Sequence, residues 1–459
     1  MDGAWAQASE IAAAVSEGRI SAAAVVGAAL ARIRQLNSKL NAFTDVLGER
    51  ALERAQAIDR TRAKGPLAGV PFAVKNLFDI AGLATRAGSR INRDRAPATR
   101  DATLIAHLEA AGAVLVGALN MGEYAYDFTG ENVHDGDCRN PHDLTRMTGG
   151  SSSGSACAVA AGLTALALGS DTNGSIRVPS SLCGVFGLKP TYGRLSRAGT
   201  FPFVASLDHV GPMARSARDL ALAYDAMAGP DADDPVCTSR PAVRTIPLIA
   251  RGIAGLRIAV AGGYFRAGAF PEAQTALARV AAARGAKAEI EFPEAARARA
   301  AAYAITASEG GALHLDRLRA RARDFDPAVR DRLIAGAMIP ASIVVKAQKF
   351  RCWYRARVLE LFADVDAVLA PATPCAAPRL GQQTFVLDGV ELALRPNMGV
   401  YTQPISFVGL PVVTVPVPLE PLPVGVQIIA APWREDVALS IAYALEHMGI
   451  ASAKRPALE

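Results

Sequence analysis

The chain has 459 residues, of which 51% are hydrophobic and 20% are charged. This length allows either one large unit or two to three domains, and the composition is ample for a large core. The net charge of +6 comes from scattered basic residues, and aromatic residues make up only 6%. Without a basic run or abundant aromatic residues, the sequence argues against nucleic-acid binding.

The sequence shows no pattern typical of a secreted or membrane-spanning protein. Asp2 and Glu10 interrupt any basic-then-apolar pattern of a secretory signal. The longest apolar stretches are too short, or too interrupted by proline, to span a bilayer. The six cysteines are widely spaced without a CxxC pair, which fits reduced thiols. We therefore expect a cytoplasmic protein that has no contact with a membrane.

Helices and strands are predicted to alternate along the first half of the chain. The first two helices begin near serines that can act as N-caps, and they form a predicted N-terminal helical arm over residues 1–60. The alternation after the arm indicates an α/β fold. Hydrophobic periodicity predicts helices over 9–17, 21–36, 103–111 and 156–168, and strands over 67–76 and 113–117.

In the second half, a loop rich in proline and aspartate at 229–235 separates the predicted elements. Residues 271–362 are predicted to be mostly helical and rich in arginine, with a break at 309–311. Further strands are predicted over 256–261, 367–370 and 424–430. We therefore expect a single domain over residues 61–459, with a mostly helical variable insert at about 265–362.

Two loops rich in glycine and serine carry the candidate nucleophiles, Ser151 in GGSSSGS at 149–155 and Ser175 in DTNGSIR at 171–177. The predicted helix between them would fix both loops to one rigid element, so the two serines can meet. Lys75 ends a predicted buried strand. Desolvation there should lower the pKa of Lys75 and make available the neutral amine that a serine nucleophile needs as a base.

Other interpretations of these motifs are open. Residues 150–154 match the G-x-S-x-G nucleophile elbow, with Ser152 as the nucleophile of an α/β-hydrolase. That fold requires a strand directly before the elbow, whereas residues 139–143 form a polar loop that contains proline. Arg177 could bind a substrate carboxylate or pair with Asp171 to hold its loop.

His134, Cys138 and His142 are spaced four apart, as in some metal sites. Their segment is predicted to be a loop rather than a helix, so the spacing does not place them on one face, and no metal site is expected. Tyr124 and Tyr126 fit equally well as core residues and as walls of a pocket.

Taken together, the motifs closely resemble those of the amidase signature family. The resemblance runs from about Leu67 to Gln427 and covers nearly the whole chain. Asn173, where glycine is usual, together with 76–79 and 409–411, is most similar to the carboxybiuret and oxalurate hydrolase branch. The resembling blocks are 149–152, 169–179, 183–191, 206–212, 366–374 and 422–427.

This resemblance implies an α/β/α sandwich with a large mixed central β-sheet. It implies that Ser175 is the nucleophile, that Ser151, after a cis peptide bond, is the bridging serine, and that Lys75 is the base. The expected oxyanion hole consists of Thr172, Asn173, Gly174 and Ser175. The residues expected to bind substrate are Gly149, Gly150, Ser152, Tyr124 and Tyr126.

The implied activity is release of ammonia from a small amide or ureido acid such as carboxybiuret, biuret or oxalurate, without a metal or organic cofactor. The family likeness also implies a homodimer that binds a small helical partner protein, and an insert that shapes the substrate pocket. The alternative is an ammonia-supplying protein similar to the amidase-like component of glutamine amidotransferases, which serves tRNA-dependent amidation. A non-catalytic scaffold is disfavoured because Lys75, Ser151 and Ser175 are all present.

Overall fold

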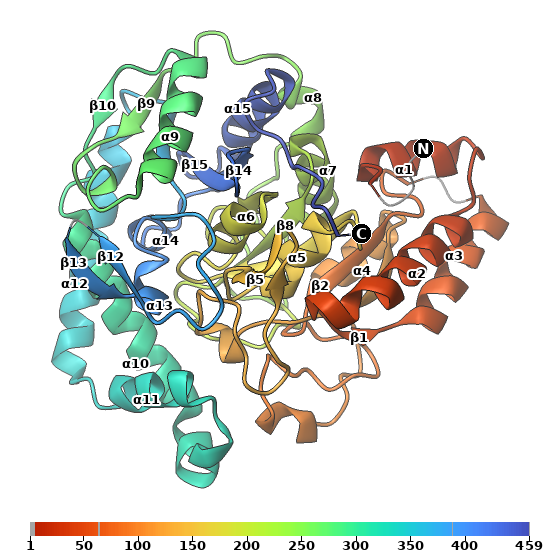
Figure 1. Cartoon of the computed structure of the whole chain (residues 1–459), viewed down its shortest axis with the longest axis horizontal. Helices are drawn as coiled ribbons and strands as arrows, with labels where there is room; N and C mark the ends of the chain where they lie inside the picture. Colours follow the sequence, from red (N-terminus) through yellow and green to blue (C-terminus); the bar gives the residue numbers. More distant parts are fainter. Residues whose placement is uncertain (1–4, 63–64, 388, 459) are drawn as a thin grey trace.

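A mixed sheet of eleven strands runs through the middle of the molecule (Figure 1). The computed structural model describes residues 5–62, 65–387 and 389–458, so residues 1–4 of the predicted arm lie outside the described residues. The predicted α/β fold with a large mixed central sheet is confirmed. From one edge to the other the strands are β1 (Phe43–Val46), β3 (Val114–Leu119), β2 (Pro71–Lys75), β6 (Leu166–Asp171), β8 (His209–Ala214), β7 (Phe186–Lys189), β14 (Val412–Val417), β15 (Val424–Ala430), β11 (Ala367–Pro371), β9 (Ile258–Ala261) and β10 (Glu289–Ile290).

The central strands are buried on both faces by helices. In β2, Phe72 and Val74 pack into one hydrophobic cluster while Ala73 between them packs into another, because successive side chains of a strand point to opposite faces. Such strands are apolar along their whole length, which explains why the sequence pattern found them. The helices are α1 (Ala8–Ser16), α2 (Ala22–Leu40), α3 (Gly48–Thr61), α4 (Thr103–Ala110), α5 (Ser153–Ala160), α6 (Arg177–Cys183), α7 (Ala217–Met227), α8 (Ile246–Ile249), α9 (Pro271–Arg284), α10 (Ala295–Arg321), α11 (Pro327–Ala337), α12 (Ala341–Leu361), α13 (Leu394–Asn397), α14 (Gln403–Ser406) and α15 (Glu435–His447).

The N-terminal helices α1 to α3 and the long helices α10 to α12 lie on opposite sides of the molecule (Figure 1). Ser21 caps α2 as predicted, since its Oγ accepts a hydrogen bond from Ala24 N at 3.1 Å. The predicted cap of α1 at Ser9 is wrong. That helix is preceded by Gln7, which forms a capping box with Glu10.

The predicted break at 309–311 is also wrong, because α10 continues through it. The two glycines serve close packing instead. A Cβ on Gly311 would lie 2.4 Å from Ala337 N, and one on Gly310 would lie 2.8 Å from the ring of Phe203. Helix α11 can therefore approach α10 closely at this point.

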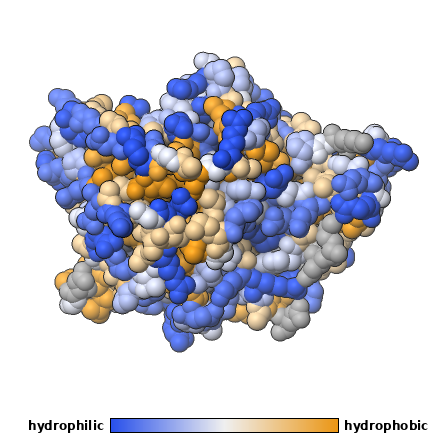
Figure 2. Space-filling model, turned by 90° about the horizontal axis from the view of Figure 1, so that it is seen from above, coloured by the Kyte–Doolittle hydropathy of each residue, from blue (hydrophilic) through white to orange (hydrophobic). Residues whose placement is uncertain are grey.

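Two short hairpins lie outside the main sheet, β4 (Arg139–Asn140) with β5 (Asp143–Met147), and β12 (Thr384–Leu387) with β13 (Val390–Ala393). All six cysteines are free thiols. Among the described helices, none combines the length and the hydrophobicity needed to cross a bilayer. On the face shown in Figure 2, hydrophobic residues gather mainly left of the centre, while hydrophilic residues dominate the right side, where the N-terminal helices lie.

Candidate active site

Lys75 lies at the carboxyl end of β2, between the parallel strands β3 and β6. Its side chain is fully buried, and its Nζ donates hydrogen bonds to Ser151 Oγ at 2.7 Å and to Ser170 Oγ at 2.9 Å. Burial lowers the pKa of Lys75 to about 7, although the charges of Asp171 and Asp208 act in the opposite direction. A large share of this amine is therefore neutral at neutral pH.

The two serine-rich loops meet through a helix followed by a strand rather than across one long helix. The predicted helix over 156–168 is wrong in its second half, since residues 166–171 form β6. A turn at Gly162 reverses the chain, so the start of α5 lies beside the end of β6. There Ser152 Oγ donates to Ser170 O at 3.1 Å and accepts from Ser170 N at 3.2 Å.

Two glycines precede Ser151, and the Gly150–Ser151 peptide bond is cis. Gly149 has a φ of +76°, and a Cβ there would lie 3.0 Å from Pro179 Cα. A Cβ on Gly150 would lie 2.6 Å from Asp127 Oδ2. The glycines let the backbone before Ser151 pack tightly. They line neither of the two cavities described below.

A buried ion pair anchors the loop that carries Ser175. Arg177 donates through Nε and Nη2 to the two carboxylate oxygens of Asp171, each at 3.0 Å. Its Nη1 donates to Thr402 O at 3.0 Å and to Gln427 Oε1 at 2.8 Å. Although burial raises the pKa of Asp171, the attraction of Arg177 holds it well below its usual value. Of the two roles considered for Arg177, the structure supports the pairing that holds the loop.

Three successive backbone N–H groups of this loop have no protein partner. Those of Asn173, Gly174 and Ser175 donate to no described residue, although all three residues are buried. Buried N–H groups without an acceptor are rare in folded proteins. Gly174 has a φ of +146°, and a Cβ there would lie 2.2 Å from Thr402 Oγ1. Only glycine therefore allows this backbone conformation and this close contact.

Ser175 lines a narrow pocket together with Thr172 and Asn173. The opposite walls come from helices of the predicted insert and from the segment around α14. Other side chains that line this pocket, called the Ser175 pocket from here on, are Tyr126, Tyr303, Thr306, Arg332 and Gln403.

The two candidate tyrosines have different surroundings. Tyr126 lines the Ser175 pocket. Tyr124 does not, because its ring packs in the core with its centroid 4.0 Å from that of His314, and its hydroxyl donates to Asn92 Oδ1 at 3.2 Å. Since Tyr124 is only 1% exposed, a substrate contact there is not supported.

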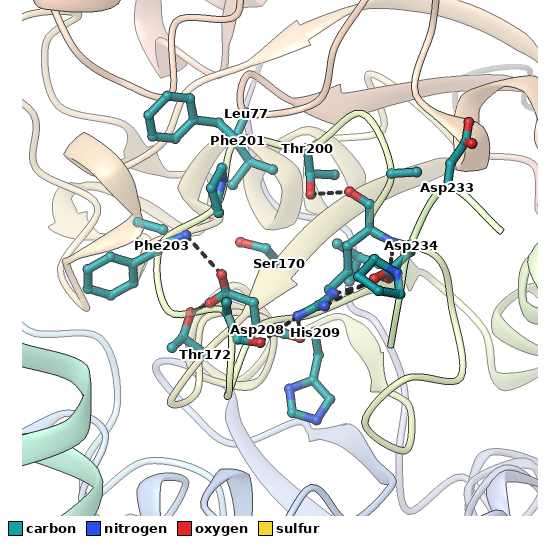
Figure 3. Close-up of a pocket in the computed structure, with 17 residues that line it drawn as sticks. Leu77, Ser170, Thr172, Thr200, Phe201, Phe203, Asp208, His209, Asp233 and Asp234 are labelled. Atoms are coloured by element: carbon teal, nitrogen blue, oxygen red, sulfur yellow. Dashed lines mark hydrogen bonds and ion pairs between the residues drawn. The ribbon is translucent and has the colours of Figure 1, made fainter. Parts of the chain in front are cut away.

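A second cavity, of about 200 Å³, adjoins the Ser175 pocket and shares Thr172 and Phe203 with it. Ser170 projects into this cavity opposite the rings of Phe201 and Phe203 (Figure 3). Sequence reasoning gave Ser170 no role, although it directly precedes Asp171 in the recognised motif. Its contact with Lys75 depends on the register of β6 against β2, which no sequence pattern supplied.

The two histidines considered as metal ligands have other partners. His134 Nε2 lies 2.9 Å from Glu123 Oε1, and His142 Nε2 lies 3.1 Å from Cys183 O. Within the part of the chain that the structure describes, no group of three or more His, Cys, Asp or Glu residues is arranged to hold a metal ion.

Comparison with known proteins identifies the family. The sequence model described as Amidase matches residues 24–439. The chain belongs to the amidase signature family. It is therefore an amidohydrolase, which sets aside the α/β-hydrolase interpretation of Ser152.

Relatives of this amidase match it over nearly its whole length. It is 53% identical to AtzE, a 1-carboxybiuret hydrolase subunit of Pseudomonas sp. (strain ADP), over 97% of this chain and 99% of that protein. It is 37% identical to the A subunit of the glutamyl-tRNA(Gln) amidotransferase of Roseiflexus castenholzii, over 95% and 94% of the two chains.

Solved structures agree with this assignment. One solved chain superposes with a TM-score of 0.97 at 53% identity, over 98% of this chain and 100% of that one. It is described as part of a vestigial protein complex that reveals the evolutionary origins of an s-triazine catabolic enzyme. The 6-aminohexanoate cyclic dimer hydrolase superposes with a TM-score of 0.88 at 28% identity, over 100% of both chains.

Proposed function

We propose that Ser175 is the nucleophile of an amide hydrolysis in which Ser151 and Lys75 relay its proton. Neutral Lys75 accepts a proton from Ser151 while Ser151 accepts one from Ser175, and Ser175 Oγ attacks the carbonyl carbon. The observation that carries this proposal is the hydrogen bond of 2.7 Å between Ser151 Oγ and the fully buried Nζ of Lys75. A base with a pKa near 7 suits proton transfer at neutral pH.

The unpartnered N–H groups of Asn173, Gly174 and Ser175 support an oxyanion hole in this loop. The side chain of Thr172 helps to hold this loop in place, because its Oγ1 donates a hydrogen bond to Asp208 Oδ1 at 2.6 Å. The charged oxygen of the tetrahedral intermediate would accept hydrogen bonds from the free donors. The relay then returns the proton to the leaving nitrogen, ammonia departs, and water cleaves the acyl-enzyme by the same relay. No metal or organic cofactor takes part in these steps.

The proposed substrate is a small ureido acid or amide such as carboxybiuret, oxalurate or biuret. The support is the 53% identity with a 1-carboxybiuret hydrolase subunit over nearly the whole length of both proteins. The narrowness of the Ser175 pocket and the size of the adjoining cavity, about 200 Å³, also favour a small substrate.

A role in supplying ammonia to a tRNA-dependent amidotransferase is the second candidate function. It is supported by the 37% identity with the relative from a glutamyl-tRNA(Gln) amidotransferase, which is clearly lower than the identity with the carboxybiuret hydrolase relative. Such a protein would act on glutamine and would depend on a partner, so the two functions differ in substrate.

We also propose a homodimer that binds a small helical protein. The solved relative described as part of a protein complex supports a partner. An apolar groove of about 730 Å³ between α2 and α3, lined by Leu30, Ile33, Val46 and Leu52, would accept the apolar face of an amphipathic helix. A small helical partner protein should then co-purify with the chain, and Leu52→Asp should prevent this.

The function is tested by assaying ammonia release from oxalurate, carboxybiuret, biuret and glutamine. Release from the ureido compounds by the chain, alone or with its small partner, supports the proposal. Release of ammonia from glutamine, but from none of the ureido compounds, would favour the amidotransferase function. Absence of release from every compound, from a folded protein with its partner, would contradict both.

A further inference from the structure

Asp208 places a carboxylate beside the proposed relay. It is partly exposed and lines the cavity of about 200 Å³ together with Ser170, whose Oγ accepts a hydrogen bond from Lys75 Nζ. In Figure 3, Asp208 and Ser170 face the same space, and Thr172 lies next to Asp208. The carboxylate is therefore near the amine of Lys75, and its charge favours the ammonium form of this lysine.

Every contact of the Asp208 carboxylate comes from a donor. Thr172 Oγ1 donates to Oδ1 at 2.6 Å, while Phe203 N and Val204 N donate to Oδ2 at 2.8 Å and 2.9 Å. Although burial raises the pKa of Asp208, these hydrogen bonds act in the opposite direction. An environment made only of donors favours the ionised carboxylate.

The nearest cation is committed to another carboxylate. Arg197 donates through Nε and Nη2 to the two carboxylate oxygens of Asp234, each at 3.1 Å. Its Nη1 donates to the backbone carbonyl groups of Ala205 at 2.7 Å and of Asp208 at 3.4 Å. Burial holds the pKa of the neighbouring His209 well below its usual value, so this ring is neutral. Within the described part of the chain, the Asp208 carboxylate thus has no ion-pair partner.

The other carboxylates near Lys75 are neutralised by arginines. The carboxylates whose charge favours its ammonium form are Asp171, Asp208 and Asp127. Asp171 accepts two hydrogen bonds from Arg177, each at 3.0 Å, and Asp127 forms an ion pair with Arg395. Of these three charges, the one at Asp208 is therefore left for the lysine itself.

Such a charge matters most when the relay operates. Each transfer of a proton to Lys75 converts a neutral amine into a cation inside the protein, where charge is poorly solvated. A carboxylate without another cation stabilises this product of the transfer, and with it the transition state that leads there. The benefit is absent while the amine is neutral, so it acts on the rate rather than on substrate binding.

We propose that Asp208 supports the relay through Lys75, because its unpaired charge stabilises the ammonium form that each proton transfer creates. This inference rests on the proposed hydrolysis at Ser175. Through its contact with Thr172, Asp208 also holds the loop that carries the nucleophile. Asp208 is thus a positioning residue that acts on the reacting groups through its two neighbours.

Asp208→Asn removes the charge and can keep the contacts. The asparagine Oδ1 can accept from Phe203 N and Val204 N, while its Nδ2 donates to Thr172 Oγ1, because a hydroxyl group can also accept. We expect the midpoint of the pH profile of kcat/KM to move to lower pH by about one unit. The plateau of kcat should fall by up to about tenfold with KM little changed, since the lysine becomes a weaker base.

Two further variants separate charge from packing. Asp233 lines the same cavity, but it is exposed and forms an ion pair with Arg100 at 2.9 Å. Asp233→Asn should move the midpoint by less than about 0.3 units, because water and salt screen an exposed charge. Thr172→Val keeps the charge of Asp208 and removes the hydrogen bond that holds the loop. It should lower kcat without moving the midpoint, and an unchanged kcat would exclude the hold on the loop.

The titration of Lys75 is measured separately, so that a failure of the proposed hydrolysis can be recognised. In protein labelled with ¹³C-lysine, the NMR signal that Lys75→Met removes should titrate near pH 7 in wild type and about one unit lower in Asp208→Asn. If no compound is hydrolysed but this shift appears, the proposed function fails while the link between the two residues stands. If Lys75 titrates at the same pH in both folded proteins, the inference is wrong. Should Asp208→Asn not fold, Asp208→Ser also removes the charge and decides between the same two outcomes.

Discussion

Lys75 Nζ and Ser170 Oγ lie 2.9 Å apart, so the proposed base contacts a hydroxyl group outside the proposed triad. In the ammonium form Lys75 donates to both Ser170 and Ser151. A neutral amine has two N–H groups and one lone pair. If one N–H is directed at Ser170, the lone pair can face Ser151 and accept its proton. We therefore assign Ser170 a positioning role in the relay.

Replacing Ser170 should impair the relay without removing it. In Ser170→Ala we expect kcat to fall roughly tenfold with KM little changed, because the amine loses one partner that orients it. Ser170→Thr keeps the hydroxyl group and should recover most of the loss. Steady-state kinetics from about pH 6 to about pH 9 would measure this. A loss that Ser170→Thr does not recover would indicate a packing role instead.

Replacing the proposed nucleophile should abolish activity. We expect Ser175→Ala to reduce ammonia release by roughly a thousandfold or more, because no covalent intermediate can form. The fold should survive, since only one hydroxyl group is removed. Ser155→Ala is a matched control, because Ser155 Oγ donates to the carbonyl of Leu168 at 2.9 Å and takes no part in the relay. More than about a hundredth of wild-type turnover in Ser175→Ala would contradict the assignment.

The pH dependence of activity should report the protonation of Lys75. Its pKa is lowered to about 7 by burial, and only the neutral amine can accept a proton. Activity should therefore rise from acid towards mildly alkaline pH, with a midpoint near pH 7. Lys75→Ala should be nearly inactive at every pH. A rate that falls as the pH rises through this range would exclude a neutral lysine base.

Removal of metal ions should have no effect on activity. The proposed relay uses only side chains of the chain, and His134 and His142 already contact Glu123 and Cys183. Dialysis against EDTA, followed by the ammonia assay, would check this. Loss of activity that added zinc restores would revive the site considered at His134, Cys138 and His142.

The sequence predicted the fold and the segments that form the site, but not the side-chain contacts within the site. The buried strand that ends on Lys75 was predictable because strands covered on both faces are apolar throughout. The contact of Lys75 with Ser170 was not, since it depends on strand register. Gly311 resembled a helix break although it serves close packing of α10 against α11.

The same buried lysine should make stability depend on pH. The folded pKa of Lys75 is about 7 against an ordinary value of 10.5. Between these values the unfolded chain binds more protons than the folded protein, so the free energy of unfolding should rise with pH. Lys189, which is also fully buried with a pKa lowered to about 7 by burial, should contribute in the same direction. Each lysine adds at most about 1.4 kcal/mol per pH unit.

Urea unfolding from about pH 7.5 to about pH 8.5 would measure these contributions. This window lies above the pKa of Glu446, which burial raises to about 7, so that carboxyl group adds little to the slope. In Lys75→Met the rise of the unfolding free energy with pH should be smaller than in wild type. Lys189→Met should reduce it by a similar amount, and the double variant should lose both contributions. An equal slope in Lys75→Met and wild type would mean that Lys75 stays protonated in the folded protein, and the proposed base would then have to be another group.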